Sequence, residues 1–143
     1  MRIFVEKISS PSDLKKAFGI REKVFVEEQN VPSELEYDEF EDSSVHYLAT
    51  MEGKPAGTAR WRETGKGIKL ERFAVHKEMR GKGVGDALVH RTLKDVALHG
   101  SSYIYMHAQS SVIPFYEKFG FVKKGEEFEE AGILHFEMYY SGK

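Results

Sequence analysis

The fold of this chain is decided by residues 70–88, LERFAVHKEMRGKGVGDAL. The segment begins as an apolar strand pattern, passes through a charged turn and enters a glycine-dense loop that opens a helical pattern. Glycine lets backbone N–H groups approach a ligand because it carries no Cβ, and a helix N-terminus adds unpaired donors and a partial positive charge. The segment therefore predicts a phosphate-binding turn, to which Arg80 and Lys82 add two full positive charges.

The spacing of the glycines excludes two common phosphate motifs. A P-loop requires Gly-x-x-x-x-Gly-Lys-Ser/Thr, and the sequence contains no such run. A dinucleotide-binding turn requires a third small residue where this chain has Asp86 or Leu88, depending on the glycine from which the count starts. The pattern that remains is Arg80-x-x-Gly83-x-Gly85 between a strand and a helix. A loop that begins a helix and binds no ligand could have the same pattern.

Length and composition indicate one globular domain over residues 1–143. Hydrophobic residues make up 41% of the chain and charged residues 31%, as in ordinary globular proteins. The net charge of −2 provides no basic field, so no nucleic-acid partner is expected. The absence of cysteine excludes disulfides and is compatible with a reducing cytoplasm, the expected location. No apolar run reaches the length of a membrane span, so no membrane association is expected.

The expected elements follow the order β-α-β-β-β-α-β-α-β-β, which predicts an α/β protein with a mixed sheet flanked by helices. Ser10 and Ser111 are expected to be helix N-caps, because a serine hydroxyl can accept a hydrogen bond from the first helical turn. Gly100 is expected at the position just after a helix C-terminus. The expected strands cover residues 2–8, 46–51, 55–63, 68–75, 102–108, 121–123 and 133–140.

One charged residue falls on the apolar stripe of the first helix. Arg21 shares a helical face with Leu14, so its guanidinium points toward the core. A buried charge is costly unless it is paired, and acidic residues follow closely, with Glu28, Glu36 and Asp38 the leading partners. Two interpretations are open: a structural ion pair, or a polar wall for a substrate amine.

Three features resemble the GNAT superfamily of N-acetyltransferases. The Arg80-x-x-Gly83-x-Gly85 loop resembles the acyl-CoA pyrophosphate loop of that family. Residues 112–121, VIPFYEKFGF, resemble its late helix, and the order of elements is similar to its fold over essentially the whole chain. The GNAT fold is therefore the expected architecture.

Narrower resemblances concern the first helix and the C-terminal strands. The stretches RxxVFxxEQ at 21–29, ExD at 36–38 and AGIxH at 131–135, together with His46, resemble the small bacterial subgroup of ElaA- and YjcF-like proteins. The first helix also resembles acyl-homoserine-lactone synthases. An acyltransferase of that kind, or a CoA-binding or regulatory protein without catalysis, is kept as the alternative function.

The resemblance implies acetyl-CoA as cofactor, with CoA as the released product. Backbone donors of the strand at 73–75 would pair with the pantetheine as an added strand does, and the loop at 81–86 would hold the pyrophosphate. Gln109 stands where many relatives carry asparagine near the pantetheine. The residues implied in cofactor binding are Phe73, Ala74, Val75, Arg80, Gly81, Lys82, Gly83, Val84, Gly85, Asp86, Gln109, Phe115 and Tyr116.

Direct transfer of an acetyl group from a thioester to a primary amine requires an acid for the departing thiolate. Tyr116 is the candidate, because a phenol is protonated at neutral pH and the family resemblance places this residue beside the CoA sulfur. Periodicity alone favours a packing role for Tyr116 at the edge of an amphipathic helix. No protein nucleophile is needed when the amine attacks directly, which suits a chain without cysteine.

Glu71 and His135 are the leading candidates for the base that accepts the amine proton, ahead of His107 and His46. Glu71 shares a strand face with apolar residues, a setting that would raise its pKa; the alternative is a cross-strand ion pair with Arg60 or Arg62. His135 has a suitable intrinsic pKa and belongs to the Gly-Ile-x-His element, although a single strand histidine is also a common structural residue.

The acceptor is expected to be a small-molecule amine or a peptide, bound between the first helix, the acidic segment after it and the C-terminal strands. An acidic rim would suit a cationic amine. A homodimer is compatible with the sequence, and the histidines show no metal-ligand spacing, so no metal is predicted. The residues expected at the acceptor site are Arg21, Phe25, Glu28, Gln29, Asp38, Arg60 and His135.

Overall fold

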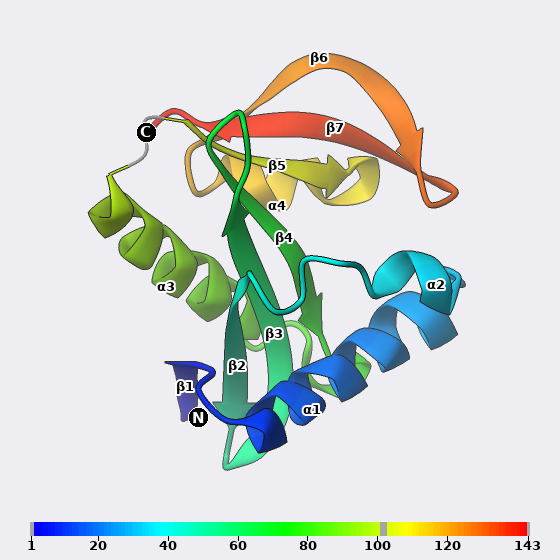
Figure 1. The fold of residues 1–143 in the computed structure, drawn as a ribbon, viewed down its shortest axis with the longest axis vertical. Coiled ribbons are helices and arrows are strands. Elements are labelled where there is room, and N and C mark those ends of the chain that lie inside the picture. The colour runs from blue at the N-terminus through cyan, green and yellow to red at the C-terminus, as the bar shows by residue number, and fades with distance from the viewer. Residues whose placement is uncertain (1, 101–102, 143) are drawn as a thin grey trace.

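Seven strands form one sheet in the computed structural model, which describes residues 2–100 and 103–142 (Figure 1). Their order across the sheet is β1-β2-β3-β4-β5-β7-β6, and among these strands only β4 and β5 pair in parallel. The mixed sheet and the predicted order of helices and strands are confirmed. The strands are β1 (Ile3–Lys7), β2 (Val45–Met51), β3 (Lys54–Glu63), β4 (Ile68–Val75), β5 (Ile104–Gln109), β6 (Phe121–Glu130) and β7 (Ile133–Tyr140).

The helices begin and end mostly where the sequence predicts. The Ser10 hydroxyl accepts a hydrogen bond of 3.2 Å from the backbone N–H of Asp13, and Gly100 ends α3 with a left-handed φ of 87°. The short α2 was not predicted. The helical elements are α1 (Pro11–Arg21), the π-helix η1 (Glu22–Glu28), α2 (Ser33–Glu36), the 3₁₀ turn η2 (Lys77–Met79), α3 (Val84–His99), the 3₁₀ turn η3 (Ser110–Val112) and α4 (Ile113–Glu117).

The helices cover both faces of the sheet, with α3 and α1 on opposite sides of the central strands (Figure 1). On one face, Leu88 and Val89 of α3 and Ile113 of α4 pack against Leu70 of β4 in the larger apolar core. On the other face, α1 and η1 form a smaller core against Leu48 and Ala74. Apolar residues therefore alternate between two cores along β4 until a bulge interrupts the alternation.

The sheet opens between its two parallel strands. The pairing of β4 with β5 covers only residues 68–70 and 104–106, and the strands diverge beyond it. Opposite this point the β3–β4 register shifts, and Arg72 takes a left-handed φ of 59°, as in a β-bulge. Figure 1 shows the consequence: β3 and β4 run down the view, whereas β5 and β7 run nearly across it.

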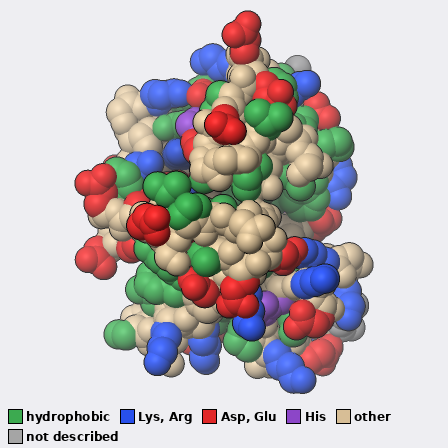
Figure 2. Space-filling view, turned by 90° about the vertical axis from the view of Figure 1, so that its right-hand side faces the viewer, with side chains coloured by type: hydrophobic (Ala, Val, Ile, Leu, Met, Phe, Trp, Pro, Cys, Tyr) green, Lys and Arg blue, Asp and Glu red, His purple; other side chains and the backbone are tan. Residues whose placement is uncertain are grey.

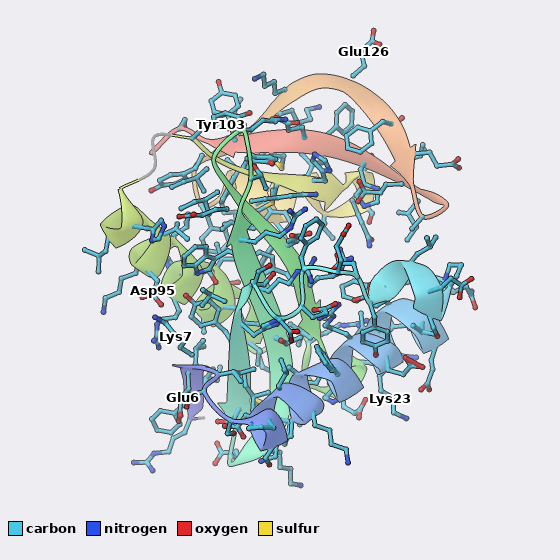
Figure 3. All side chains as sticks on the ribbon, viewed as in Figure 1. Glu6, Lys7, Lys23, Asp95, Tyr103 and Glu126 are labelled. Carbon is cyan, nitrogen blue, oxygen red and sulfur yellow. The ribbon has the colours of Figure 1, made fainter. Side chains whose placement is uncertain are left out.

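Two predicted boundaries were wrong. Ser111 does not cap the last helix; it lies inside η3, and α4 begins at Ile113 without a side-chain cap. The strand expected at 121–123 continues to Glu130, because an edge strand can be charged and exposed on both faces and then shows no apolar alternation. Glu126 accordingly projects outward from β6 (Figure 3). Residue 102, expected to begin β5, lies outside the described residues.

No helix in the described part of the chain combines the length and the apolar character that crossing a membrane requires.

Candidate active site

A cleft of about 980 Å³ opens where β4 and β5 diverge. It is lined by the end of η1, the outer half of β4, the glycine loop, the start of α3, the end of β5, α4 and the start of β7. A cleft between the carboxyl ends of diverging parallel strands is a common ligand site in α/β proteins. One end of it holds the glycine loop, and the other holds most of the charged side chains.

The glycine loop forms a cradle of backbone donors. Gly83 is the N-cap of α3 with a left-handed φ of 94° and provides no side-chain cap. The first hydrogen bond of the helix runs from Ala87 N–H to the Gly83 carbonyl, so the preceding N–H groups of the first turn face outward. A Cβ on Gly85 would lie 3.2 Å from the Phe115 ring, so glycine keeps this surface open. These residues fit a phosphate group at the helix N-terminus.

The outer half of β4 offers a free strand edge to the cleft. The N–H of His76 donates to Ala56 on the β3 side. Because successive N–H groups of a strand alternate in direction, those of Val75 and Phe73 face the opposite side, where β5 has diverged. An extended ligand lying in the cleft can therefore pair with β4 as a further strand would.

The Arg80 side chain is hydrogen-bonded to other residues of the protein. Its terminal nitrogens donate to the Glu28 carboxylate at 2.5 and 2.8 Å, and its Nε donates to the Val75 carbonyl at 3.0 Å. Lys118 of the α4 end also lines the cleft, 3.8 Å from Asp86. Two cations therefore lie near the cradle, and each is close to a carboxylate of the protein.

A hydrogen bond between two glutamines spans the cleft near the Arg80–Glu28 pair. The side-chain amide of Gln109, at the end of β5, donates to the side-chain oxygen of Gln29 at 2.8 Å. Gln29 follows η1, so the same end of η1 touches both the glycine loop, through Glu28, and β5. The segment after η1 thus lies close to the cradle and to the middle of the cleft.

Tyr116 lines the cleft beside the free edge of β4. Its ring packs edge-on against Phe73 at 5.8 Å and Phe121 at 6.2 Å between ring centroids, and the residue is 8% exposed. Among the described residues its hydroxyl has no hydrogen-bond partner, so the proton is available to a ligand. Burial raises the pKa of Tyr116, which keeps the phenol protonated.

The structure contradicts the expected apolar setting of Glu71. Burial alone would raise the pKa of its carboxyl, but the charges of Arg60, Lys69 and Arg62 lower it below the usual value. Arg62 Nε donates to one carboxylate oxygen, and Arg60 lies 3.2 Å from the other. A carboxylate held in this way is a poor proton acceptor. The cross-strand ion pair is the interpretation that the geometry supports.

Arg21 and Arg60 do not line the cleft, contrary to expectation. Arg21 is 1% exposed and binds Glu36 at 2.7 Å and Glu41 at 2.8 Å. Arg60 is 0% exposed and binds Asp38 at 2.7 Å and Glu41 at 2.9 Å. The predicted Arg21–Glu36 pair is confirmed, while Glu41 takes the place expected for Asp38 or Glu28. This buried ion cluster ties α1 and the acidic segment to β3.

His135 faces the cleft from β7 with a defined tautomer. Its Nδ1 lies 2.7 Å from the Ile133 carbonyl oxygen, which can only accept, so Nδ1 carries a proton. In the neutral ring Nε2 is then the free acceptor, and no described residue hydrogen-bonds it. The ring stacks on Phe128 at 5.9 Å, which fixes its plane.

His107 and Glu130 form a neighbouring pair at the same end of the cleft. His107 Nδ1 lies 3.1 Å from a Glu130 carboxylate oxygen. This hydrogen bond, with the charge of His107, lowers the pKa of Glu130 to about 2 against the opposing effect of burial. Acidic and basic side chains are interspersed over this side of the molecule, with no large patch of one sign (Figure 2).

Most of the residues expected in the site lie on the cleft, but several lining residues were missed. The expected cofactor residues all line it except Lys82, and from the expected acceptor set Phe25, Gln29, Asp38 and His135 do. Glu28 reaches it only through Arg80. Lys69 is two residues before Glu71, so the alternation of side chains along a strand could have identified it. His107, a weaker candidate for the base, also lines the cleft. The missed charged residues are Glu36, Arg62, Lys69, Arg72, Lys118 and Glu130.

Among residues 2–100 and 103–142, no group of three or more metal-binding side chains is arranged to hold a metal ion.

Residues 9–141 match the family model described as the acetyltransferase (GNAT) domain, and the chain belongs to this family of acyltransferase enzymes. The uncharacterized N-acetyltransferase YjcF of Bacillus subtilis is 44% identical over 126 residues, covering 87% of this chain and 90% of YjcF. ElaA of Escherichia coli is 31% identical over 134 residues, covering 90% and 88% of the two chains. The predicted family and its ElaA- and YjcF-like subgroup are confirmed.

Solved structures show the same architecture. The crystal structure of Escherichia coli ElaA superposes with a TM-score of 0.84, covering 98% of this chain and 100% of that one at 27% identity. A Bacillus subtilis acetyltransferase in complex with CoA superposes with a TM-score of 0.73 at 18% identity, covering 97% and 98%. That neighbour thus has the same fold and was solved with CoA bound.

Proposed function

We propose that the protein transfers the acetyl group of acetyl-CoA directly to a primary amine. One observation carries this proposal: a free strand edge, a glycine cradle at a helix N-terminus and an unpaired, protonated tyrosine hydroxyl border the same cleft. Each matches one part of an acyl-CoA, namely the pantetheine amides, the pyrophosphate and the sulfur. When bound, acetyl-CoA supplies the activated acyl carbon.

The cradle and the strand edge would hold the cofactor. The outward N–H groups of the first α3 turn, with Gly81 and Gly83, would bind the pyrophosphate, and Lys118 and Arg80 would add charge. The N–H groups of Phe73 and Val75 would pair with the pantetheine amides. This arrangement directs the reactive end toward Tyr116 and the charged half of the cleft.

Two side chains would move protons. The acceptor attacks as the neutral amine, and His135 Nε2 accepts the proton that its nitrogen loses as the nitrogen–carbon bond forms, because Nδ1 already carries a proton that is bound to Ile133. Tyr116 donates its hydroxyl proton to the departing thiolate, so the sulfur leaves as a thiol. The nitrogen–carbon bond forms as the carbon–sulfur bond breaks, and no covalent enzyme intermediate is required. Glu71 is assigned a structural role in this scheme.

The proposal is tested by mixing the protein with acetyl-CoA and a panel of amines, polyamines, amino acids and peptides. Release of free CoA thiol is followed together with the mass of the acceptor. The expected result is acetyl-CoA hydrolysis that is negligible without acceptor and CoA release that matches acetylated product. Acetyl-CoA binding without CoA release against the whole panel would support the alternative of a CoA-binding protein without transferase activity.

A further inference from the structure

The acidic residues around the acceptor half of the cleft are already neutralised. Glu36 binds Arg21 at 2.7 Å, and Asp38 accepts from Arg60 at 2.7 and 3.0 Å. Glu71 and Glu130 are likewise held by Arg62 and by His107. Glu36, Asp38 and Glu71 thus each have an arginine in hydrogen-bond contact, and Glu130 has a histidine, so these acids offer a cationic amine less attraction than the sequence suggests.

Lys69 lines the acceptor half of the cleft, and its ammonium has no carboxylate within hydrogen-bond distance among the described residues. Its ammonium makes no hydrogen bond within residues 2–100 and 103–142, and the nearest carboxylate oxygen, on Glu71, lies 3.9 Å away. The side chain is only 14% exposed and lines the cleft. Burial lowers the pKa of Lys69, and the nearby charges of Glu71 and Glu130 oppose this effect only in part.

A second cation stands directly beside it. Arg62 pairs with Lys69 across β3 and β4, so two positive side chains share one face at adjacent positions. Like charges in direct cross-strand register are unfavourable, and Glu71 lies near both, bonded to Arg62 Nε and 3.9 Å from the Lys69 ammonium. Arg62 gives only its Nε to Glu71, and its guanidinium stacks over the Phe40 ring at 3.8 Å. Its two terminal nitrogens have no hydrogen-bond partner in the described part of the chain.

The Lys69 ammonium and the terminal nitrogens of Arg62 are therefore cationic hydrogen-bond donors that no described residue of the acceptor half occupies. Taking the proposed acetyl transfer as its basis, we infer that the acceptor is an amine that also carries a carboxylate, which Lys69 and Arg62 bind while the amine faces His135. A carboxylate supplies the two acceptor oxygens that an ammonium and a guanidinium edge can share. The class that fits is an amino acid or a compound with the same pairing of amine and carboxylate.

The other residues that line the acceptor half of the cleft support this placement of the acceptor. Lys69, Arg62 and His135 all line the same cleft, so the two cations and the proposed base border one space. Apolar side chains of η1, α2 and β7 line the rest of it: Val24, Phe25, Leu35 and Ile133. They suit an apolar side chain on the acceptor, which favours hydrophobic amino acids over small polar ones.

The test compares acceptors that differ only in the carboxylate. L-phenylalanine, L-leucine and L-methionine are each measured beside the matching amino acid amide and the matching decarboxylated amine, for wild type and for Lys69→Met. Wild type is expected to favour the carboxylates in kcat/KM by about 10- to 100-fold, the usual worth of a hydrogen bond to a charged group. Lys69→Met is expected to lose most of that preference while keeping its activity on the plain amines.

Lys66→Met is the matched control. Lys66 is on the same side of the sheet but outside the cleft, where it binds Glu137 at 2.7 Å and covers the Tyr105 ring at 4.6 Å. Its replacement should leave the preference unchanged. Thermal unfolding with and without acetyl-CoA checks that both variants fold and bind the cofactor.

The outcomes separate the inference from the proposed function. Efficient acetylation of the amides and plain amines, with the carboxylates no better in wild type, would overturn the inference and leave the transferase intact. If no acceptor releases CoA, the proposed function fails, and calorimetric titration of L-phenylalanine into CoA-saturated protein still tests the anion site. Binding that Lys69→Met weakens at least about tenfold would support it, and equal or absent binding would overturn it.

Discussion

Glu28 binds Arg80 through two hydrogen bonds, of 2.5 and 2.8 Å, at the edge of the glycine loop. The arginine of the pyrophosphate-loop pattern is therefore neutralised by a residue of η1 when no phosphate is near. Phosphate and carboxylate would compete for the same guanidinium edge. The affinity for acetyl-CoA should then depend on a residue that lies outside the loop.

Replacing Glu28 by glutamine tests this competition. Glu28→Gln should free Arg80 and tighten acetyl-CoA binding by about two- to fivefold, because exposed ion pairs contribute only ~0.2–1 kcal/mol. The measurement is the dissociation constant by calorimetry. Glu27→Gln is the control, since Glu27 is exposed on η1 and lies 3.7 Å from Lys23, which points away from the sheet (Figure 3). Weaker binding in Glu28→Gln would show that Glu28 orients Arg80 for the phosphate instead.

The cradle is tested by a pair of glycine substitutions on α3. Gly83→Ala and Gly100→Ala place a Cβ on left-handed residues (φ 94° and 87°) at opposite ends of the same helix, with space for it at both. Each should cost about 1 kcal/mol of stability. Only Gly83→Ala should weaken acetyl-CoA binding, by about tenfold or more, because it moves donors that bind a charged group.

Equal acetyl-CoA affinities in these two variants would contradict the cradle. A general loss of folding would appear in both variants alike, so the comparison separates strain from ligand contact.

The buried ion cluster predicts how stability depends on pH. Burial alone would raise the pKa of Asp38, but the hydrogen bonds and charge of Arg60, with the charge of Arg72, lower it to about 2. A carboxyl whose folded pKa is depressed stabilises the fold above its unfolded pKa of about 3.9. That contribution is lost as the pH falls from about 4 through about 2.

Asp38→Asn should therefore be less stable than wild type at pH 7, by about 1 kcal/mol after allowance for solvent screening. The difference should shrink as the pH falls through this range, which urea denaturation at a series of pH values measures. Asp42→Asn, at an exposed residue that has no ion pair in the described part of the chain, should track wild type throughout. A difference for Asp38→Asn that does not change between pH 7 and pH 2 would contradict the ion-pair account.

His135 can be tested as the base without disturbing the fold. His135→Gln keeps a polar side chain but removes the proton acceptor, so kcat should fall by about 10²–10⁴. Binding of acetyl-CoA should be unchanged, because His135 belongs to the acceptor half of the cleft. His90→Gln is the control, on the exposed side of α3 against Phe119. Unchanged kcat in His135→Gln would remove His135 from the proton path.

The sequence predicted the fold, and the residues that it assigned to cofactor binding, Lys82 excepted, lie together on the cleft, because both depend on local signals. The glycine spacing, the strand before it and the start of the helix after it all lie within residues 70–88. The cap at Ser10 and the turn at Gly100 are equally local.

The acceptor end of the cleft was predicted less well, because its side chains are paired with residues far away in the sequence. Arg21 meets Glu41 across 20 positions, and Arg80 meets Glu28 across 52. Glu71 was expected in apolar surroundings because its strand neighbours are apolar, but the β-bulge at Arg72 and the adjacent β3 bring several cations to it. Lys69 remained unnoticed because its role depends on which acids other residues have already neutralised.

The proposed transfer depends most directly on Tyr116, whose hydroxyl has a single assigned task. Tyr116→Phe removes this proton donor and keeps the ring that packs against Phe73, Phe115 and Phe121. The deciding measurement is kcat of the variant, with the best acceptor found, beside its dissociation constant for acetyl-CoA. A fall in kcat of about 10²–10⁴ with the dissociation constant unchanged is predicted, because the interaction exists mainly in the transition state. Turnover equal to wild type would contradict the account and leave Tyr116 as a packing residue.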